Sequence, residues 1–367
     1  MEYKLFYELI RVAVGTQDAL SHLPSHKEWK VLYDMAVKQS LVGVGFAGLQ
    51  RLGADADEGY TRIGMSEMLY LTWMSLATQI QQKNEVLDQQ CVALQKQLAA
   101  DGLRSVILKG QGVGQLYGFL TGLRQSGDID VWISGSRDKT MAYVQQVSPT
   151  NHVTWLHTQL KVFDETEVEI HFMPAYMRCP WLNARLQKWF MKYEDFDKFC
   201  VNDGIRVPSL EFNLVFLLLH IFRHLLGEGI GLRQVMDYYF VLQRSQGAWG
   251  GLDRQEDIMI LLKQLRLHQF ASGLMWVMED VFELKQECML CEPDERLGRL
   301  ILREIELSGN FGHHDERSKK GESAWMRFYR TNVTNLRFIR YFPEEVLCTP
   351  FYRIWHKCWQ MKYGYRG

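Results

Sequence analysis

The feature that most constrains the fold is a short region, residues 105–172, in which strand-like patterns replace helical ones. Residues 105–108 form a brief apolar run, and residues 128–133 form a second run bounded by glycine-containing turns. Residues 160–162 and 168–172 alternate around a polar turn, as the two strands of an antiparallel hairpin do. The middle of the chain therefore predicts a small unit of mixed helix and strand.

Both flanks of this region predict helices. Residues 1–104 and 206–367 carry apolar residues at spacings of three and four, and the chain has only 8 Pro. The stretch 66–100 lacks Pro and Gly and predicts one long helix or two in line, whereas 210–226 is apolar nearly all round and predicts a buried helix. We expect an α+β fold in which residues 105–205 form an α/β core between two helical regions.

Charge and cysteine content exclude several classes of protein. Lys and Arg number 42 against 43 Asp and Glu, so no global basic field exists to hold a nucleic-acid backbone. We expect no transmembrane helix and no cleavable signal, because the chain lacks a run of 18 apolar residues and its start carries acids. Seven cysteines, an odd number, suit reduced thiols and a cytoplasmic protein. We interpret the lone C-x-x-C of Cys288 and Cys291 as ordinary thiols.

Three acids of the strand region share a predicted face. Asp128 and Asp130 are two residues apart, and side chains at i and i+2 of a strand point to the same side. Glu169 lies on a later strand, where its apolar neighbours point the opposite way. If these strands pair, the three carboxylates converge, and a hard divalent cation such as Mg²⁺ or Mn²⁺ relieves their repulsion. We expect Glu167, which lies nearer the hairpin turn, to face solvent.

A glycine-containing turn follows the first predicted strand. Gly110 and Gly112 allow a phosphate to approach the backbone, and the start of the next helix offers free N–H groups. Lys109 adds a positive point charge, and Arg124, four residues before Asp128, adds a two-pronged guanidinium. Beside the carboxylates, this turn predicts metal-assisted phosphoryl-group chemistry.

The order of these motifs resembles the DNA-polymerase-β-like nucleotidyltransferase superfamily: ILKG, a helix, LRQSGDIDVWI and then VEIHF. More narrowly, it resembles bacterial nucleotidyltransferases that carry Lys-Gly where most relatives carry Gly-Gly or Gly-Ser. The likeness covers roughly residues 100–245 and includes the segments HIFRH and GLRQ. It implies a small mixed nucleotidyltransferase sheet flanked by N-terminal and C-terminal helical regions.

The resemblance also implies an activity, namely metal-dependent transfer of a nucleotidyl group from an NTP to an acceptor with release of pyrophosphate. Asp128, Asp130 and Glu169 would be the catalytic ligands of Mg²⁺ or Mn²⁺. The residues that would bind the nucleotide belong to the turn and to the segment before Asp128: Lys109, Gly110, Gln111, Gly112, Arg124 and Ser126. The turn departs from the Gly-Ser of most relatives, so Lys109 and Gly110 would hold the phosphates differently. The acceptor stays open between a small molecule, a glycan, a protein and RNA.

Other interpretations stay open beside this one. A degenerate member of the same fold could bind a nucleotide or a protein partner without turnover. A Rossmann unit is disfavoured because the glycines do not fit G-x-G-x-x-G, and because Asp128 opens its strand whereas the Rossmann acid closes one.

His220 and His224 have the i, i+4 spacing of a metal-binding pair on a helix. With Asp237 and the polar stretch 313–315, they could belong to a helical metal phosphohydrolase. We favour a structural interpretation, in which the two histidines, Arg233 and Asp237 lock the helices against the sheet. A substrate-facing role for one histidine is the main alternative.

The chain from Arg317 onward is basic, with 11 Lys and Arg against 3 acids. Four of these residues have the spacing of one helix face: Arg327, Arg330, Arg337 and Arg340. We expect acids elsewhere in the fold, such as Glu304 or Glu306, to neutralise them. The alternative is an anionic partner, that is, a nucleic acid, a phosphorylated acceptor or a lipid surface.

Overall fold

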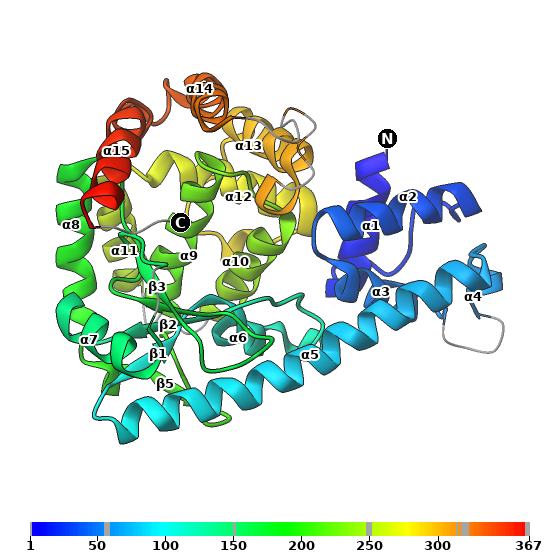
Figure 1. The fold of residues 1–367 in the computed structure, drawn as a ribbon. Coiled ribbons are helices and arrows are strands. Elements are labelled where there is room, and N and C mark those ends of the chain that lie inside the picture. The colour runs from blue at the N-terminus through cyan, green and yellow to red at the C-terminus, as the bar shows by residue number, and fades with distance from the viewer. Residues whose placement is uncertain are drawn as a thin grey trace.

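The computed structural model describes residues 2–54, 59–149, 152–246, 252–312 and 323–363, together with Asp315 and Arg317. It shows an α+β fold with a small central sheet, and helices precede and follow the strands of this sheet along the chain (Figure 1). The N-terminal helices are α1 (Glu2–Val14), α2 (His26–Lys38), α3 (Val42–Arg51), α4 (Gly59–Arg62) and α5 (Glu67–Ala100).

The helix α5 contributes to two hydrophobic cores. Its 34 residues extend about 50 Å at 1.5 Å per residue. Its first half packs into the larger core with the other helices, and its second half covers the sheet in the second core (Figure 1). Asn84, between the two halves, donates hydrogen bonds to the carbonyl oxygens of Gly122 and Arg124, both at 2.7 Å. The predicted long helix is therefore one element. Through Asn84 it holds the loop of residues 122–124, which precedes Asp128. Its buried residues recur every three, four or seven positions: Tyr70, Trp73, Ala77, Asn84, Leu87, Cys91, Leu94 and Leu98.

A four-stranded mixed sheet lies at the centre, in the order β1-β2-β4-β3. Strand β2 pairs antiparallel with β1 and parallel with β4, and β3 and β4 form the predicted antiparallel hairpin. The antiparallel pairing of β1 with β2 excludes a Rossmann unit, whose consecutive strands run parallel. The helix α7 (Arg137–Val147) follows β2, as predicted. The strands are β1 (Ser105–Ile107), β2 (Ile129–Ile133), β3 (His157–Leu160) and β4 (Val168–His171).

Several elements differ from the sequence-based expectation. The helix α8 (Pro180–Phe190) and the hairpin of β5 (Cys200–Asn202) and β6 (Ile205–Val207) were absent from it. After β1, the helix α6 (Lys109–Gly114) has only six residues and gives way to a 3₁₀ helix, η1 (Gln115–Leu120). A helix this short contributes little dipole, so any phosphate affinity here depends on the glycine backbone and on charged side chains.

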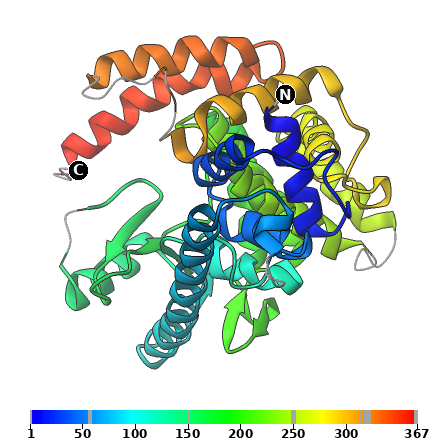
Figure 2. The same cartoon turned by 90° about the vertical axis from the view of Figure 1, so that its right-hand side faces the viewer.

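The last two helices, α14 (Ala324–Asn335) and α15 (Pro343–Lys362), lie side by side along one edge of the molecule in Figure 2. The helix α9 is buried on almost every side, as its sequence predicts. Near its end, α15 reaches the loop before β3, where the Trp155 ring lies 5.1 Å from Trp355 and 5.8 Å from Trp359 between centroids. The helices are α9 (Leu210–Leu225), α10 (Leu232–Ser245), α11 (Leu252–Gln264), α12 (His268–Phe282), α13 (Glu295–Ser308), α14 (Ala324–Asn335) and α15 (Pro343–Lys362).

The expectation of one arginine face on one helix is wrong. The helix α14 ends at Asn335, and a 3₁₀ turn, η6 (Leu336–Phe338), follows it. Two of the four arginines therefore lie on α14, and the other two lie in or directly after the 3₁₀ turn.

Among the described residues, no helix combines the length and apolar character needed to cross a bilayer. All seven cysteines are free thiols, as the sequence predicts.

Candidate metal and nucleotide site

The sheet brings the three predicted carboxylates together. Asp128 directly precedes β2, Asp130 lies within it, and the parallel register places Asp130 beside Glu169 of β4. One carboxylate oxygen from each residue lies within 4.8 Å of the others. Asp130 is buried and Asp128 is exposed, so the group opens toward solvent on one side. We call Asp128, Asp130 and Glu169 the carboxylate centre.

Oxygen donors in this arrangement suit a hard divalent cation. Opposite ligands of one Mg²⁺ lie about 4 Å apart, close to the spread of the three oxygens. Asp128, Asp130 and Glu169 could therefore hold Mg²⁺ or Mn²⁺ without a change in sheet register. Glu167 is exposed and hydrogen-bonded to Gln159, so it stays outside the centre, as expected.

Lys109 is the cation nearest to the carboxylates. Its Nζ lies 2.7 Å from Asp130 Oδ1. Lys109 and Gly110 both have positive φ, 36° and 37°, a conformation that is costly for lysine and easy for glycine. Gly112 has a different requirement, because a Cβ there would lie 2.5 Å from the carbonyl oxygen of Ile107. The turn is thus held in a strained shape that points the lysine at the centre.

One lysine does not neutralise three carboxylates. The charge of Asp130, followed by burial, raises the pKa of Asp128 above its ordinary value. Burial alone would raise the pKa of Asp130, but the ammonium of Lys109 and the His171 ring outweigh it and lower that pKa. Burial opposes the charged form of Lys109 too, and the carboxylates still hold the pKa of Lys109 above its usual range. The raised pKa of Asp128 shows negative charge that the protein itself leaves uncompensated.

Two histidines support the carboxylates, and sequence reasoning did not assign them to the site. His171 Nε2 lies 2.8 Å from Asp130 Oδ1 and 3.5 Å from Glu169 Oε2, and His157 Nδ1 lies 2.9 Å from the same Glu169 oxygen. Burial opposes ionisation of Glu169, but these two rings lower its pKa. The E-x-H spacing on β4 and the alternation of His157 with Gln159 on β3 were the signals that could have found them.

His157, Glu169 and His171 also form a second group with metal-ligand spacing. The Nδ1 atom of His171 is buried and has no hydrogen-bond partner among the described residues. The ring proton therefore belongs on Nε2, where it is donated to Asp130. We interpret His171 as a residue that orients the carboxylates.

The predicted Gln111, Arg124 and Ser126 surround the turn and bond to the protein. Gln111 Nε2 donates to Asp88 Oδ1 at 2.6 Å. Arg124 donates through Nε and Nη2 to the two oxygens of Asp237, each at 2.7 Å, and through Nη1 to Ser126 Oγ at 3.0 Å. All three side chains are buried, so in this structure they hold the turn and the loop before β2. Their contact with a nucleotide stays a prediction.

Asp237 and Arg233 do lock α10 against the sheet region. Asp237 also accepts a hydrogen bond from Tyr117 Oη at 2.7 Å, and Arg233 Nη1 donates to the carbonyl oxygen of Gln125 at 2.5 Å. The structural interpretation of these two residues is confirmed.

His220 and His224 lie on α9 with their ring centroids 4.4 Å apart. Burial lowers the pKa of His220, and the charges of His224 and Lys109 lower it further. Burial also lowers the pKa of His224, although Glu228 Oε2 lies 3.5 Å from its Nδ1. Neither histidine belongs to a metal-ligand group among the described residues, and His313 and His314 lie outside them.

Comparisons with known proteins identify the family of this chain. A family model described as "Uncharacterised nucleotidyltransferase" matches residues 25–283. No curated protein matches the chain. The crystal structure of an antigenic nucleotidyltransferase-like protein from Paracoccidioides brasiliensis has 12% sequence identity and a TM-score of 0.29, and it covers 58% of this chain and 96% of that one. A TM-score this low does not establish that the two proteins share a fold. Because the family model spans more than half of the chain, the protein belongs to this nucleotidyltransferase family.

Proposed function

We propose that this protein transfers a nucleotidyl group from an NTP to an acceptor hydroxyl and releases pyrophosphate. The observation that carries the proposal is the convergence of Asp128, Asp130 and Glu169 beside the strained turn of Lys109 and Gly110. A divalent cation held by these carboxylates would neutralise charge on the phosphates and on the attacking oxygen.

The residues of the turn are suited to the triphosphate. Gly110 and Gly112 leave the backbone open to a phosphate, and Lys109 Nζ lies beside Asp130, where it can meet a phosphate oxygen of a donor bound at the carboxylates. Gln111, Arg124 and Ser126 contribute by holding the turn and the loop before β2 in place.

The reaction requires the acceptor oxygen to bond to the α-phosphorus while the bond to the bridging oxygen of pyrophosphate breaks. The acceptor proton must leave as this happens. Asp130 and Glu169 are the candidate acceptors of that proton, because both lie in the centre and their lowered pKa values keep them ionised, although the same lowering makes each a weak base. His171 keeps their oxygens in place through its contacts with both.

The experiment is a paired measurement of binding and turnover. The protein is incubated with Mg²⁺ or Mn²⁺ and each of the four NTPs, and its melting temperature is recorded with and without EDTA. Pyrophosphate release is followed in the same mixtures with candidate acceptors, namely small hydroxyl compounds, glycans, proteins and RNA. A metal-dependent rise in melting temperature with pyrophosphate release supports the proposal. No shift with any NTP contradicts it.

A second candidate function has one observation in its favour. The contact of Lys109 Nζ with Asp130 satisfies a predicted metal ligand with an internal cation. A member of the family that binds a nucleotide without turnover would show the rise in melting temperature and no pyrophosphate release under any condition.

A further inference from the structure

A second charged region of the molecule is rich in arginine. Arg223 lies in the last turn of α9, Arg178 in the segment between β4 and α8, Arg327 on α14 and Arg353 on α15. We call these four residues the arginine cluster. Arg178 Nη1 donates to Thr349, which lies one helical turn before Arg353 on α15. Burial lowers the pKa of Arg353, and the charges of Arg178 and Arg327 lower it further, whereas Glu228 and Tyr176 act in the opposite direction.

The ring of Tyr176 packs against Arg223 in this cluster. The guanidinium carbon of Arg223 lies 3.9 Å from the centroid of the Tyr176 ring. The centroids of the Tyr176 and Tyr352 rings lie 5.1 Å apart. Burial would raise the pKa of Tyr176, but the charges of Arg223 and Arg178 outweigh it and lower that pKa. Arg223 is therefore fixed by stacking on an aromatic ring rather than by an acid.

Arg178 ties the elements of the cluster together. Its Nη1 donates to Thr349 Oγ1 of α15 at 3.2 Å and to the carbonyl oxygen of Leu226 at 3.3 Å, and its Nη2 donates to the carbonyl oxygen of Arg223 at 3.4 Å. These contacts hold the end of α9 against α15, so the cluster is part of the fold.

The two acids of this region have other partners. Glu345 accepts hydrogen bonds from the backbone N–H groups of Arg178 and Cys179, at 3.1 Å and 2.9 Å. Glu228 pairs with His224. The charges of Arg178 and Arg223 favour the ionised form of both acids, but neither acid makes an ion pair with an arginine of the cluster among the described residues, and four arginines outnumber two acids.

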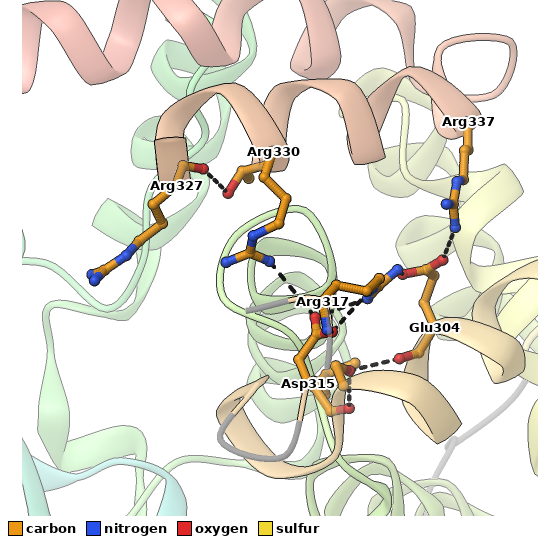
Figure 3. A network of polar contacts seen from close by, with 9 residues as sticks. Glu304, Asp315, Arg317, Arg327, Arg330 and Arg337 are labelled. Carbon is orange, nitrogen blue, oxygen red and sulfur yellow. Dashed lines mark hydrogen bonds and ion pairs between the residues drawn. The ribbon is translucent and has the colours of Figure 1, made fainter. Parts of the chain in front are cut away.

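Polar atoms of the cluster are left without partners. Arg223 Nε is buried and has no hydrogen-bond partner among the described residues. Within the same part of the chain, the guanidinium groups of Arg327 and Arg353 make no hydrogen bond or ion pair; in Figure 3 the Arg327 side chain points away from the acids that bind its neighbours. Buried donors and uncompensated charges are costly unless a ligand satisfies them.

We propose that the arginine cluster binds a phosphate group of the acceptor substrate. Guanidinium groups match phosphate oxygens in charge and in two-pronged geometry. Arg223 and His220 are three residues apart on α9, and the charge of Lys109 contributes to the lowered pKa of His220, so we infer that the cluster is on the side of α9 from which an acceptor can reach the turn. In the proposed function the turn binds the phosphates of the NTP donor. An anion bound at the cluster would therefore be part of the second substrate, the acceptor. The word acceptor rests on the proposed function, whereas the anion site rests on the cluster alone.

The test uses the full chain and inorganic phosphate as the probe. Phosphate binding is measured by calorimetry in EDTA at constant ionic strength, for the wild type, Arg223→Gln/Arg353→Gln and Arg327→Gln/Arg353→Gln. The second double variant guards against misfolding, because Arg327 is exposed and its side chain points away from the acids that bind its neighbours. Arg340→Gln removes the same charge from an exposed position of the same region and is the matched control.

We expect phosphate affinity to fall at least about tenfold in both double variants and to stay unchanged in Arg340→Gln. Absence of phosphate binding by the wild type, wild-type affinity in both double variants, or an equal loss in Arg340→Gln would each overturn the anion site.

A second arm identifies the source of the phosphate and separates this inference from the proposed function. We expect the affinity for Mg²⁺-NTP to be unchanged in Arg327→Gln/Arg353→Gln and lost in Asp128→Asn, which should still bind phosphate. A tenfold loss of Mg²⁺-NTP affinity in the arginine variant assigns the cluster to the donor and overturns the acceptor assignment. Arginine-dependent phosphate binding by a wild type that binds no NTP overturns the transfer reaction and upholds the anion site.

Discussion

Two groups of acids meet cations in this protein, and they differ in how far their charge is neutralised. In the carboxylate centre, three acids lie together and Lys109 bonds to one of them. Under α14, Glu304 bonds to Arg337 at 2.5 Å and to Arg317 at 2.9 Å, while Asp315 bonds to Arg317 at 2.9 Å (Figure 3). We call these residues the Glu304 network.

The pKa values show the same contrast. The charge of Asp130 and burial raise the pKa of Asp128. Burial would raise the pKa of Asp315 as well, but the guanidinium of Arg317 outweighs it and lowers that pKa. Acids in the network are satisfied by the fold, whereas the centre keeps a negative charge that an external cation can meet. The contrast supports a structural role for the network and our proposal that the centre binds a cation.

The network also settles the predicted neutralisation of the C-terminal arginines. Glu304 takes that role, with Asp315, whose carboxylate also lies 3.7 Å from Arg330. Glu306 does not, because it accepts a hydrogen bond from Tyr7 Oη at 2.6 Å. Arg327 is outside the network. The four arginines therefore do not act as one basic face: Arg330 and Arg337 pair with acids of the fold, whereas Arg327 belongs to the arginine cluster.

We expect the largest effect from removing one charge of the carboxylate centre. Asp128→Asn removes a metal ligand and one of the mutually repelling charges. We expect turnover to fall at least about 100-fold, since a charged ligand contributes several kcal/mol to the transition state. The melting temperature should stay level or rise, because the pKa of Asp128 is raised in the folded state. Pyrophosphate release and a thermal melt check the two halves; normal turnover refutes the assignment of Asp128.

The next effect concerns the buried pair of Arg124 and Asp237. Arg124→Ala leaves the Asp237 carboxylate unpaired in the interior, so we expect a loss of about 3–5 kcal/mol of unfolding free energy. Denaturant titration measures it. If Arg124 serves mainly as a phosphate ligand, the variant will instead keep its stability and lose only NTP affinity.

Glu304→Gln tests the neutralised region and should show the reverse of Asp128→Asn. Removing the charge that Arg317 and Arg337 share is expected to cost about 2 kcal/mol of stability. Transferase activity should not change, because the network lies outside the carboxylate centre. A variant with full stability and reduced activity would contradict the structural interpretation of the network.

The smallest effect is on the pH dependence of stability. Burial lowers the pKa of His220 in the folded state, so the unfolded chain binds more protons as the pH falls below the ordinary value of about 6.5. His220 therefore removes stability on acidification, by at most about 1.4 kcal/mol per pH unit for one proton. In His220→Gln, unfolding free energies measured from pH 7 to 5 should decline less steeply than in the wild type. An identical slope would show that His220 keeps its ordinary pKa.

How far the site could be predicted depends on the range of the interactions involved. Side-chain alternation along a strand is local, so Asp128 and Asp130 could be placed on one face from their spacing alone. The meeting of Asp130 with Glu169 needed the parallel register of β2 and β4, which the sequence only made plausible. His157 reached Glu169 through the pairing of β3 with β4, and no spacing within β3 specifies a partner on another strand.

The sequence by itself determined the helical flanks, the strands β1, β2 and β4, the placement of Asp128 and Asp130 on one face and the glycine turn, because each follows from periodicity or backbone preference within a few residues. Only the tertiary structure decided which charges are satisfied. Arg124 and Asp237 are 113 residues apart, and Arg337 and Glu304 are 33 apart. Whether an arginine meets an acid or stays open to an anion depends on how distant segments pack, and the same residue type therefore serves structure at Arg124 and Arg337 and is left uncompensated at Arg223 and Arg353.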